Sequence, residues 1–146
     1  MLADRAQAGD LAQEVFLQLH RNLKSIESRE HLVFWLRRVT AHRAIDCLRE
    51  RRRVVWAPLE AAREVPVAAA DSDPLLQGRL ERLVQQLAPM PRAVILLRYQ
   101  QDLDPLEIAR TLDIPVNTVK SHLQRSLETL RRQLSAGEFS RQGGWS

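Results

Sequence analysis

Cysteine, glycine and aromatic residues are scarce in this chain, and their scarcity limits its class. There is one cysteine, Cys47, so no internal disulfide can form and a reducing compartment is indicated. Only five glycines and 5% aromatic residues are present, whereas the helix formers Leu, Ala, Arg, Gln and Glu abound. This composition favours an all-α protein.

Long apolar runs are absent as well. None approaches the roughly 20 residues that a membrane-spanning helix requires. The N-terminus also lacks a basic segment followed by a long apolar one, which is the pattern of a secretory signal. We therefore expect a cytoplasmic protein with no membrane span.

Side chains suited to catalysis or metal binding are few. The candidates are Cys47 and the four histidines, of which His42 lies four residues before Asp46. No HExxH motif and no paired CxxC accompanies them, and a helical His near an Asp is usually a surface pair. The sequence therefore predicts neither an enzyme nor a cofactor or metal site.

Charge is distributed in blocks. The net charge is +4, and the sequence pI is about 10.2. Residues 1–56 hold 11 Lys/Arg against 7 Asp/Glu, residues 57–74 hold 1 against 4, and residues 75–146 hold 10 against 7. Two basic blocks around an acidic spacer suit a protein that touches nucleic acid at two places, although two solvated surfaces are the alternative.

Hydrophobic periodicity predicts two groups of helices. The expected helices span residues 10–24, 30–52, 75–87, a segment that opens at Pro91, a segment that follows Asp104, and 116–134. Asp10, with Gln13 three positions on, is the expected N-cap of the first helix. Apolar residues on both sides of the second helix predict that it packs between neighbours.

Residues 56–74 separate the two groups. They contain three prolines and several acidic residues and offer little to bury, so we expect a flexible linker. The prediction is therefore an all-α protein of two small domains, residues 1–55 and a four-helix domain over 75–134. The tail, 135–146, is expected to be disordered.

Residues 103–125 form the most informative stretch of the chain. Asp104, Pro105 and Glu107 occupy the N-cap, first and third positions of a capping box, the best helix-start signal in the sequence. A short amphipathic helix, a tight turn and a helix with a polar, basic face follow. This is a helix-turn-helix pattern, whose second helix enters the DNA major groove.

The two helices of this motif divide into an inner and an outer face. Ile108, Ala109 and Leu112 are expected to face Val119 and Leu123, with Ala109 small enough to let the helices cross closely. The candidate DNA-reading residues are Asn117, Thr118, Lys120, Ser121, His122, Gln124 and Arg125. Amides pair with adenine, Arg and Lys with guanine, and hydroxyls with phosphates. An ordinary helical hairpin with a polar outer face is the alternative.

These residues carry a family resemblance. Leu87, Leu97-Arg98-Tyr99, Leu106-Glu107-Ile108-Ala109 and Thr118-Val119-Lys120-Ser121 resemble the −35-binding domain of extracytoplasmic-function (ECF) sigma factors, small alternative sigma subunits of bacterial RNA polymerase. Residues 10–53 resemble the family's other domain, which binds the polymerase clamp and opens the −10 element. The matching stretches there run from Asp10 to Phe16, from Phe34 to Leu36 and from Ala44 to Arg49. Both domains occur in the family's order.

The resemblance implies a function in promoter recognition and transcription initiation, with core RNA polymerase (clamp and flap), promoter DNA and an anti-sigma factor as partners. Asp10, Gln13 and Glu14 are implied to bind the clamp, and residues 22–31 to cradle a flipped −10 base. The implied −10 DNA-binding residues are Trp35, Arg37, Arg38, His42, Arg43, Arg49, Arg51, Arg52 and Arg53. A core position for Trp35 and a solvated helix end for the arginine run are the alternatives.

The sequence departs from the family pattern in three places. Family members have another helix before the point where this chain begins, so we expect either a late start assignment or a shortened form. In that case part of the stripe formed by Leu11, Val15 and Leu19 is exposed. Asp113 stands where the turn usually has glycine, but Asp tolerates left-handed geometry. His122 replaces a common arginine and removes one positive charge.

Two other binding functions are open. A LuxR-type regulator has a recognition helix similar to Thr118–His122, but its receiver domain needs alternating strands and a phosphorylatable Asp after an apolar strand. The N-terminal half of this chain has neither. A truncated sigma-like adaptor that does not initiate transcription is the second alternative.

Overall fold

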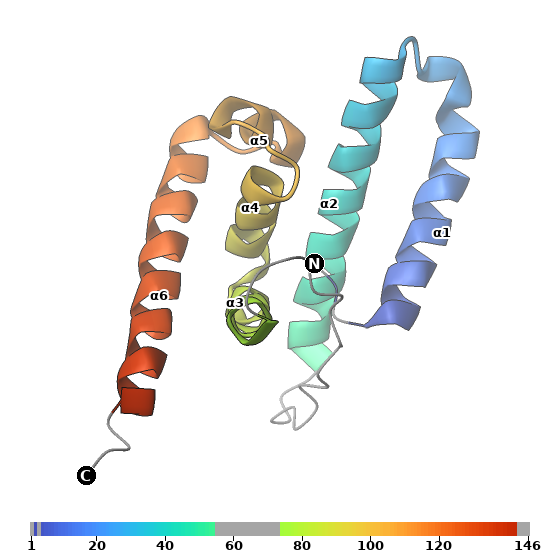
Figure 1. Ribbon diagram of the computed structural model, residues 1–146. Helices are drawn as coiled ribbons and strands as arrows, with labels where there is room; N and C mark the ends of the chain where they lie inside the picture. The colour runs from blue at the N-terminus through green and yellow to red at the C-terminus, as the bar shows by residue number, and fades with distance from the viewer. Residues whose placement is uncertain (1, 3, 55–73, 143–146) are drawn as a thin grey trace.

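The computed structural model describes residue 2 and residues 4–54 and 74–142, without the side chains of residues 52–54 and 137–142. Within these ranges all regular structure is helical, as predicted (Figure 1). The helices are α1 (Arg5–Asn22), the short 3-10 helix η1 (Leu23–Ser25), α2 (Arg29–Val54), α3 (Pro74–Gln86), α4 (Pro89–Tyr99), α5 (Pro105–Leu112) and α6 (Val116–Gln142). None of them combines the length and the apolarity needed to span a bilayer.

The N-terminal half is a hairpin in which α1 and α2 run side by side in opposite directions (Figure 1). Helix α1 begins earlier than predicted, because Asp4, not Asp10, is its N-cap and accepts a 2.9 Å hydrogen bond from the Ala6 amide. Asp10 and Gln13 therefore lie inside the helix. A glycine within a helix costs about 1 kcal/mol relative to alanine, and α1 continues through Gly9 despite this cost.

Helix α2 has neighbours on more than one side. It contacts α1 and also α4 and α5 of the C-terminal half. Ala41 and Ile45 of α2 are buried in the same hydrophobic cluster as the helix-turn-helix. The prediction that this helix packs between neighbours is confirmed, and the two halves share a core.

Two helix boundaries in the C-terminal half differ from the prediction. Helix α4 opens at Pro89, with Ala88 as its N-cap, and not at Pro91. A proline at the first helical position loses no hydrogen bond, because the backbone nitrogen there has no partner within the helix. The helix can therefore begin at the earlier of the two prolines. Helix α6 runs on to Gln142, so residues 135–142, which we predicted to be disordered, are helical. The predicted linker lies outside the described residues except for Pro74, which begins α3.

The start of α5 and the turn after it follow the predicted pattern. The Glu107 amide donates to Asp104 Oδ1 at 2.8 Å, and the Asp104 amide donates to Glu107 Oε2 at 2.9 Å, which completes the capping box. Asp113 ends α5 in the left-handed region, with φ 56° and ψ 49°. The predicted tolerance of Asp for this geometry is confirmed, and the turn places α6 against α5.

Candidate nucleic-acid interface

The inner face of the helix-turn-helix is a closed apolar core. Ile108 and Val119 are fully buried, and Ala109 and Leu112 pack beside them in the shared cluster, with Leu123 partly buried against it. Ala109 is the small residue at this crossing, as expected. This packing fixes which side of α6 can face a ligand.

The opposite face of α6 presents the predicted reading residues together. Asn117, Lys120, Ser121, Gln124 and Arg125 are exposed. The remaining two, Thr118 and His122, are half-buried at the edge of this face. A helix with amide, hydroxyl and cationic groups on one free face has the donors and acceptors that base edges and phosphates require.

The imidazole of His122 is electrostatically distinct within this face. Burial, and then the nearby charge of Arg125, lower the pKa of His122 from its usual value of 6.5. A lowered pKa favours the neutral ring, which donates from one nitrogen and accepts at the other. His122 therefore adds a hydrogen-bonding group to the recognition helix without adding a full positive charge at neutral pH.

The predicted −10 residues on α2 do not share one face. Arg43 pairs with Glu14 of α1 at 2.8 Å, whereas Arg38 approaches Asp113 of the helix-turn-helix at 4.0 Å. Five positions along an α-helix correspond to roughly 140° of rotation, so the two guanidinium groups project toward different neighbours. Arg37 lines a groove between α2 and α4.

The other members of the predicted −10 set occupy varied surroundings. Arg49 is exposed, and Arg51 is half-buried near the end of α2. Trp35 is also half-buried, so both interpretations of its role stay open. His42 Nε2 is buried and has no hydrogen-bond partner within the described part of the chain, so this atom is not placed to hold a phosphate. The side chains of Arg52 and Arg53 lie outside the described residues.

The residues predicted to bind the clamp lie at exposed positions of α1. Asp10 and Glu14 are four residues apart and share one side of the helix, with Gln13 beside them. The Glu14 carboxylate is held by the ion pair to Arg43, which ties this surface to α2. The three side chains therefore form one polar surface on the hairpin.

The exposed apolar side chains of α1 are not the ones we expected. Val15 is buried, and Leu11 and Leu19 are half-buried against the hairpin. Phe16 and Leu17 are instead 64% and 61% exposed. The stripe formed by Leu11, Val15 and Leu19 packs against α2. The exposed apolar surface lies one and two residues after Val15, and the helical period alone did not show which of these neighbouring positions would face α2.

The loop between α1 and α2 is held by local hydrogen bonds. The Ser25 hydroxyl donates to the Asn22 carbonyl at 2.7 Å, and the His31 amide donates to the Ser28 hydroxyl at 3.1 Å. The Glu27 amide donates to His31 Nδ1 at 3.2 Å. The loop predicted to cradle a flipped base is therefore a structured turn, and one ring nitrogen of His31 is already used within it.

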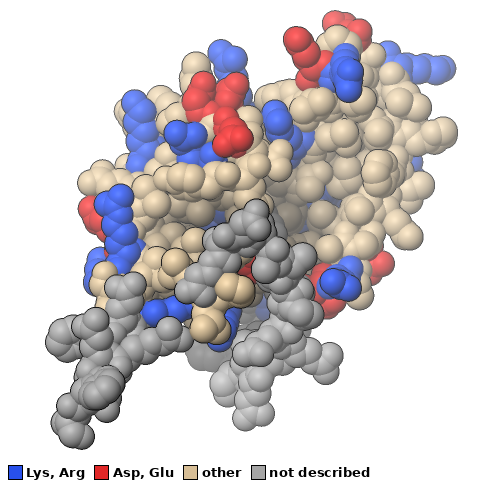
Figure 2. All heavy atoms as spheres, in the orientation of Figure 1, with Lys and Arg blue, Asp and Glu red and all other residues tan. Residues whose placement is uncertain are grey.

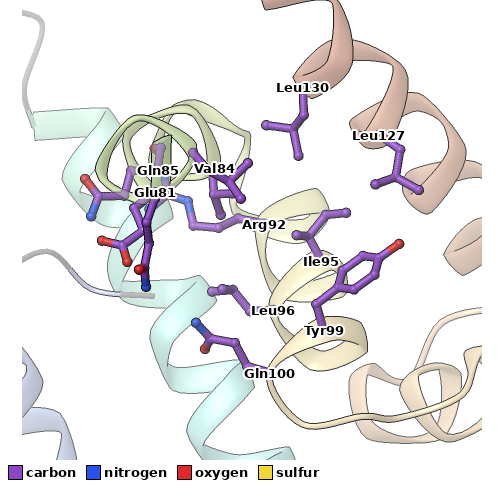
Figure 3. Close-up of a pocket in the computed structure, with 12 residues that line it drawn as sticks. Glu81, Val84, Gln85, Arg92, Ile95, Leu96, Tyr99, Gln100, Leu127 and Leu130 are labelled. Atoms are coloured by element: carbon purple, nitrogen blue, oxygen red, sulfur yellow. Dashed lines mark hydrogen bonds between the residues drawn. The ribbon is translucent and has the colours of Figure 1, made fainter. Parts of the chain in front are cut away.

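Sequence analysis did not identify the apolar pocket of the C-terminal half. The pocket has a volume of about 620 Å³ and lies between α3, α4 and α6 (Figure 3). Its apolar lining includes Leu80, Val84, Ile95, Tyr99, Leu127 and Leu130. Arg92, which was not singled out, is buried beside it and donates to the carbonyls of Gln85 and Leu87, at the end of α3. Hydrophobic periodicity predicted each of the three helices but not the pocket that they form together.

Charged side chains are interspersed on the surface. Figure 2 shows Lys and Arg spread over both halves and next to Asp and Glu, with no single continuous basic patch on the face drawn. Within the described residues no group of three or more His, Cys, Asp or Glu side chains is placed to hold a metal ion.

Comparisons with known proteins agree with this geometry. Residues 1–54 match the family described as Sigma-70 region 2, and residues 77–130 match Sigma-70 region 4. The chain is 31% identical to the ECF RNA polymerase sigma factor SigW of Bacillus subtilis, over 92% of this chain and 79% of that protein. It is also 31% identical to the RNA polymerase sigma factor CarQ of Myxococcus xanthus, over 95% of this chain and 81% of that protein.

A solved structure shares the fold. The sigma factor RpoE from Bartonella quintana, in complex with the anti-sigma factor NepR, aligns with a TM-score of 0.70 and 18% identity. The alignment covers 92% of this chain and 84% of that chain. At this identity the likeness establishes the arrangement of helices.

Proposed function

Because the chain belongs to the ECF family of RNA polymerase sigma factors, we propose that it directs core RNA polymerase to a class of promoters and initiates transcription there. The observation that carries this proposal is the match to both sigma regions, in the family's order, on one chain. A LuxR-type regulator accounts for the recognition helix but not for the match of residues 1–54 to sigma region 2. The protein acts by binding and has no catalytic role of its own.

The C-terminal half is the −35 reader in this proposal. The capping box fixes α5, α5 buries the inner face of α6, and the free face of α6 enters the major groove. Lys120 and Arg125 supply cations, while Asn117 and Gln124 supply amides for base edges. His122, neutral at physiological pH, contributes specificity more than affinity.

The N-terminal half binds polymerase and the −10 element. The exposed residues Asp10, Gln13 and Glu14 present hydrogen-bonding groups to the clamp. The C-terminal half adds a second polymerase contact, with the flap, through the apolar pocket between α3, α4 and α6. Phosphates of the −10 region are held by cations along α2, of which Arg38 and Arg49 are exposed. An anti-sigma factor is a further partner, and the cytoplasm is the site of action.

A reconstituted transcription assay tests the proposal. Fragments of the source genome are offered to core polymerase with and without this protein, and new promoter-specific transcripts are expected only with it. The Lys120→Ala variant is expected to bind the −35 element more weakly on all sequences, with a salt slope reduced by about 1, since one phosphate contact is lost.

A matched control distinguishes the loss of a DNA contact on the reading face from the loss of one positive charge elsewhere on α6. Arg131 is an exposed cation on the same helix but lies outside the helix-turn-helix, so Arg131→Ala is expected to leave −35 binding unchanged. Full-affinity, sequence-specific binding by the isolated chain, with no transcription in the presence of core polymerase, would show a conventional regulator instead.

A further inference from the structure

A histidine of α2 closes the turn between α1 and α2. The amide of Glu27 donates a 3.2 Å hydrogen bond to His31 Nδ1, and the amide of His31 donates a 3.1 Å hydrogen bond to the Ser28 hydroxyl. Ser28 directly precedes α2, and His31 is the third residue of that helix. The two hydrogen bonds therefore run in opposite directions across the first turn of α2.

This arrangement is a capping box with one substitution. A capping box pairs an N-cap serine with a glutamate at the third helical position, whose carboxylate accepts a hydrogen bond from the amide of the N-cap residue. Here the imidazole of His31 takes the place of the carboxylate and accepts from Glu27, one residue before the N-cap. The hydrogen bond therefore holds the loop that precedes the helix.

The other end of this loop is fixed to α1. The side-chain amide of Asn22 donates to the Gln18 carbonyl at 2.8 Å, and the Ser25 hydroxyl donates to the Asn22 carbonyl at 2.7 Å. Within the described residues, the Glu27–His31 hydrogen bond is the one that joins this part of the loop to α2. The shape of the loop therefore depends on that bond.

The loop lies next to an aromatic residue of the predicted −10 set. Trp35 follows His31 by four positions, so the two half-buried side chains share one side of α2. Aromatic rings at nucleic-acid sites stack on bases that have left their own stack. Residues 22–31, which the family resemblance assigns to a flipped −10 base, thus end one helical turn from a ring suited to stacking.

We propose that His31 is a positioning residue for the −10 base: by accepting the Glu27 amide, it holds the loop in the shape that receives the unstacked base. This inference rests on the proposed function, because the loop must meet promoter DNA. A loop that is ordered before its ligand arrives loses less conformational freedom on binding. The hydrogen bond therefore raises the affinity for the base without touching it.

The role of His31 requires an unprotonated ring nitrogen. A protonated imidazole has two donors and no acceptor, and an imidazole changes its charge between about pH 5 and 8. The other charged or titratable groups around the turn are His20, Arg21, Lys24, Glu27, Arg29 and Glu30. None of them forms an ion pair with His31 in the described part of the chain. We therefore expect base binding to weaken in acid through His31 itself.

NMR of the full chain tests the hydrogen bond without DNA. A scalar coupling between the amide nitrogen of Glu27 and Nδ1 of His31 is expected at about pH 8 and is expected to vanish at about pH 5.5. It is also expected to be absent in His31→Ala. If the unmodified chain shows no coupling at the higher pH, the inference is overturned.

Binding of a −10 strand by the holoenzyme tests the positioning role. A fluorescent single-stranded −10 oligonucleotide, from a promoter found in the transcription assay, is titrated into core polymerase that carries this protein. At about pH 8, His31→Ala is expected to weaken binding about fivefold, within the range for the loss of one hydrogen bond. His31→Asn supplies an amide oxygen that accepts at any pH, so it is expected to restore binding.

The same titration in acid separates positioning from a general structural role. At about pH 5.5 the unmodified protein is expected to bind as weakly as His31→Ala, and His31→Asn about fivefold more tightly than either. Helix content by circular dichroism is expected to be the same for all three proteins. If His31→Ala loses helix content, the comparison of the unmodified protein with His31→Asn at the two pH values decides alone.

Two controls complete the design. His20→Ala removes a neighbouring exposed histidine and is expected to change neither binding nor its pH dependence. An oligonucleotide with an abasic site at the flipped position is expected to bind the unmodified protein and His31→Ala equally.

Three outcomes would contradict the proposal or its premise. Equal binding of the intact strand by the unmodified protein, His31→Ala and His31→Asn overturns the positioning role. A loss in His31→Ala that persists with an abasic site at every −10 position in turn overturns it as well. A holoenzyme that binds no −10 strand, alongside a measured coupling, overturns the proposed function and the positioning role with it, while the Glu27–His31 hydrogen bond stands.

Discussion

The two long helices of the molecule, α2 and α6, use their surfaces in opposite ways. Helix α6 buries one side against α4 and α5 and leaves a continuous polar side exposed around Lys120. Helix α2 is flanked by α1 as well as by α4 and α5, and its cations Arg38 and Arg43 pair with different neighbours. A helix at the edge of a fold keeps one continuous face exposed, whereas a helix at its centre divides its surface among several neighbours.

The largest expected effect comes from breaking the inner face of α6. Ala109 is buried where α5 meets α6, so Ala109→Leu is expected to lower the free energy of unfolding by about 1–3 kcal/mol, the usual result of overpacking. Binding of −35 DNA is expected to fall with it, because α6 loses its support. Urea denaturation and a −35 duplex titration measure the two effects.

A control variant distinguishes overpacking at the buried position from any general effect of replacing alanine by leucine in a helix. Ala8 is exposed on α1, so Ala8→Leu is expected to change the unfolding free energy little. If Ala109→Leu were as mild as Ala8→Leu, the close crossing of α5 and α6 would not depend on a small residue.

How far the sequence predicts the structure differs between the same two helices. The capping box at Asp104 and the turn at Asp113 are local features, set by side chains within three residues of the backbone groups they serve, and both were predicted correctly. The surfaces of α2 depend on tertiary neighbours. The periodicity of α2 indicated burial on two sides but not which cations would face Glu14 or Asp113.

The failures of prediction have the same cause. Asp10 satisfied every local rule for an N-cap, yet Asp4 caps the helix, because good helix formers before Gly9 extend it. The pocket between α3, α4 and α6 needs three helices and so has no signature in any one segment. The division of α6 into a buried and an exposed face was predictable from residues 103–125. The assignment of its exposed face to −35 DNA stays a prediction, and so does that of the −10 residues, which rests on the family resemblance alone.

An intermediate effect is expected from the caps of the two halves. Asp104→Ala removes the side-chain acceptor of the Glu107 amide and leaves only the reciprocal hydrogen bond from the backbone amide of residue 104 to Glu107 Oε2, so it is expected to lower the free energy of unfolding by about 1 kcal/mol. Asp4→Ala removes one hydrogen bond at an exposed helix end and is expected to cost roughly 0.5 kcal/mol, the low end for such caps. Urea denaturation of both variants gives the comparison, and equal losses would contradict it.

The smallest expected effect is a pH dependence at the edge of the reading face. Burial, and then Arg125, lower the pKa of His122 in the folded protein, so the unfolded chain binds a proton more readily. The free energy of unfolding is therefore expected to decrease as the pH falls from the usual histidine value of 6.5 toward the lower folded-state pKa, and to be unaffected by this group above that range. His122→Gln is expected to flatten this part of a stability profile, and Arg125→Gln to flatten it only in part, because burial is the larger cause. A profile that keeps its full slope without His122 would assign the dependence to another group.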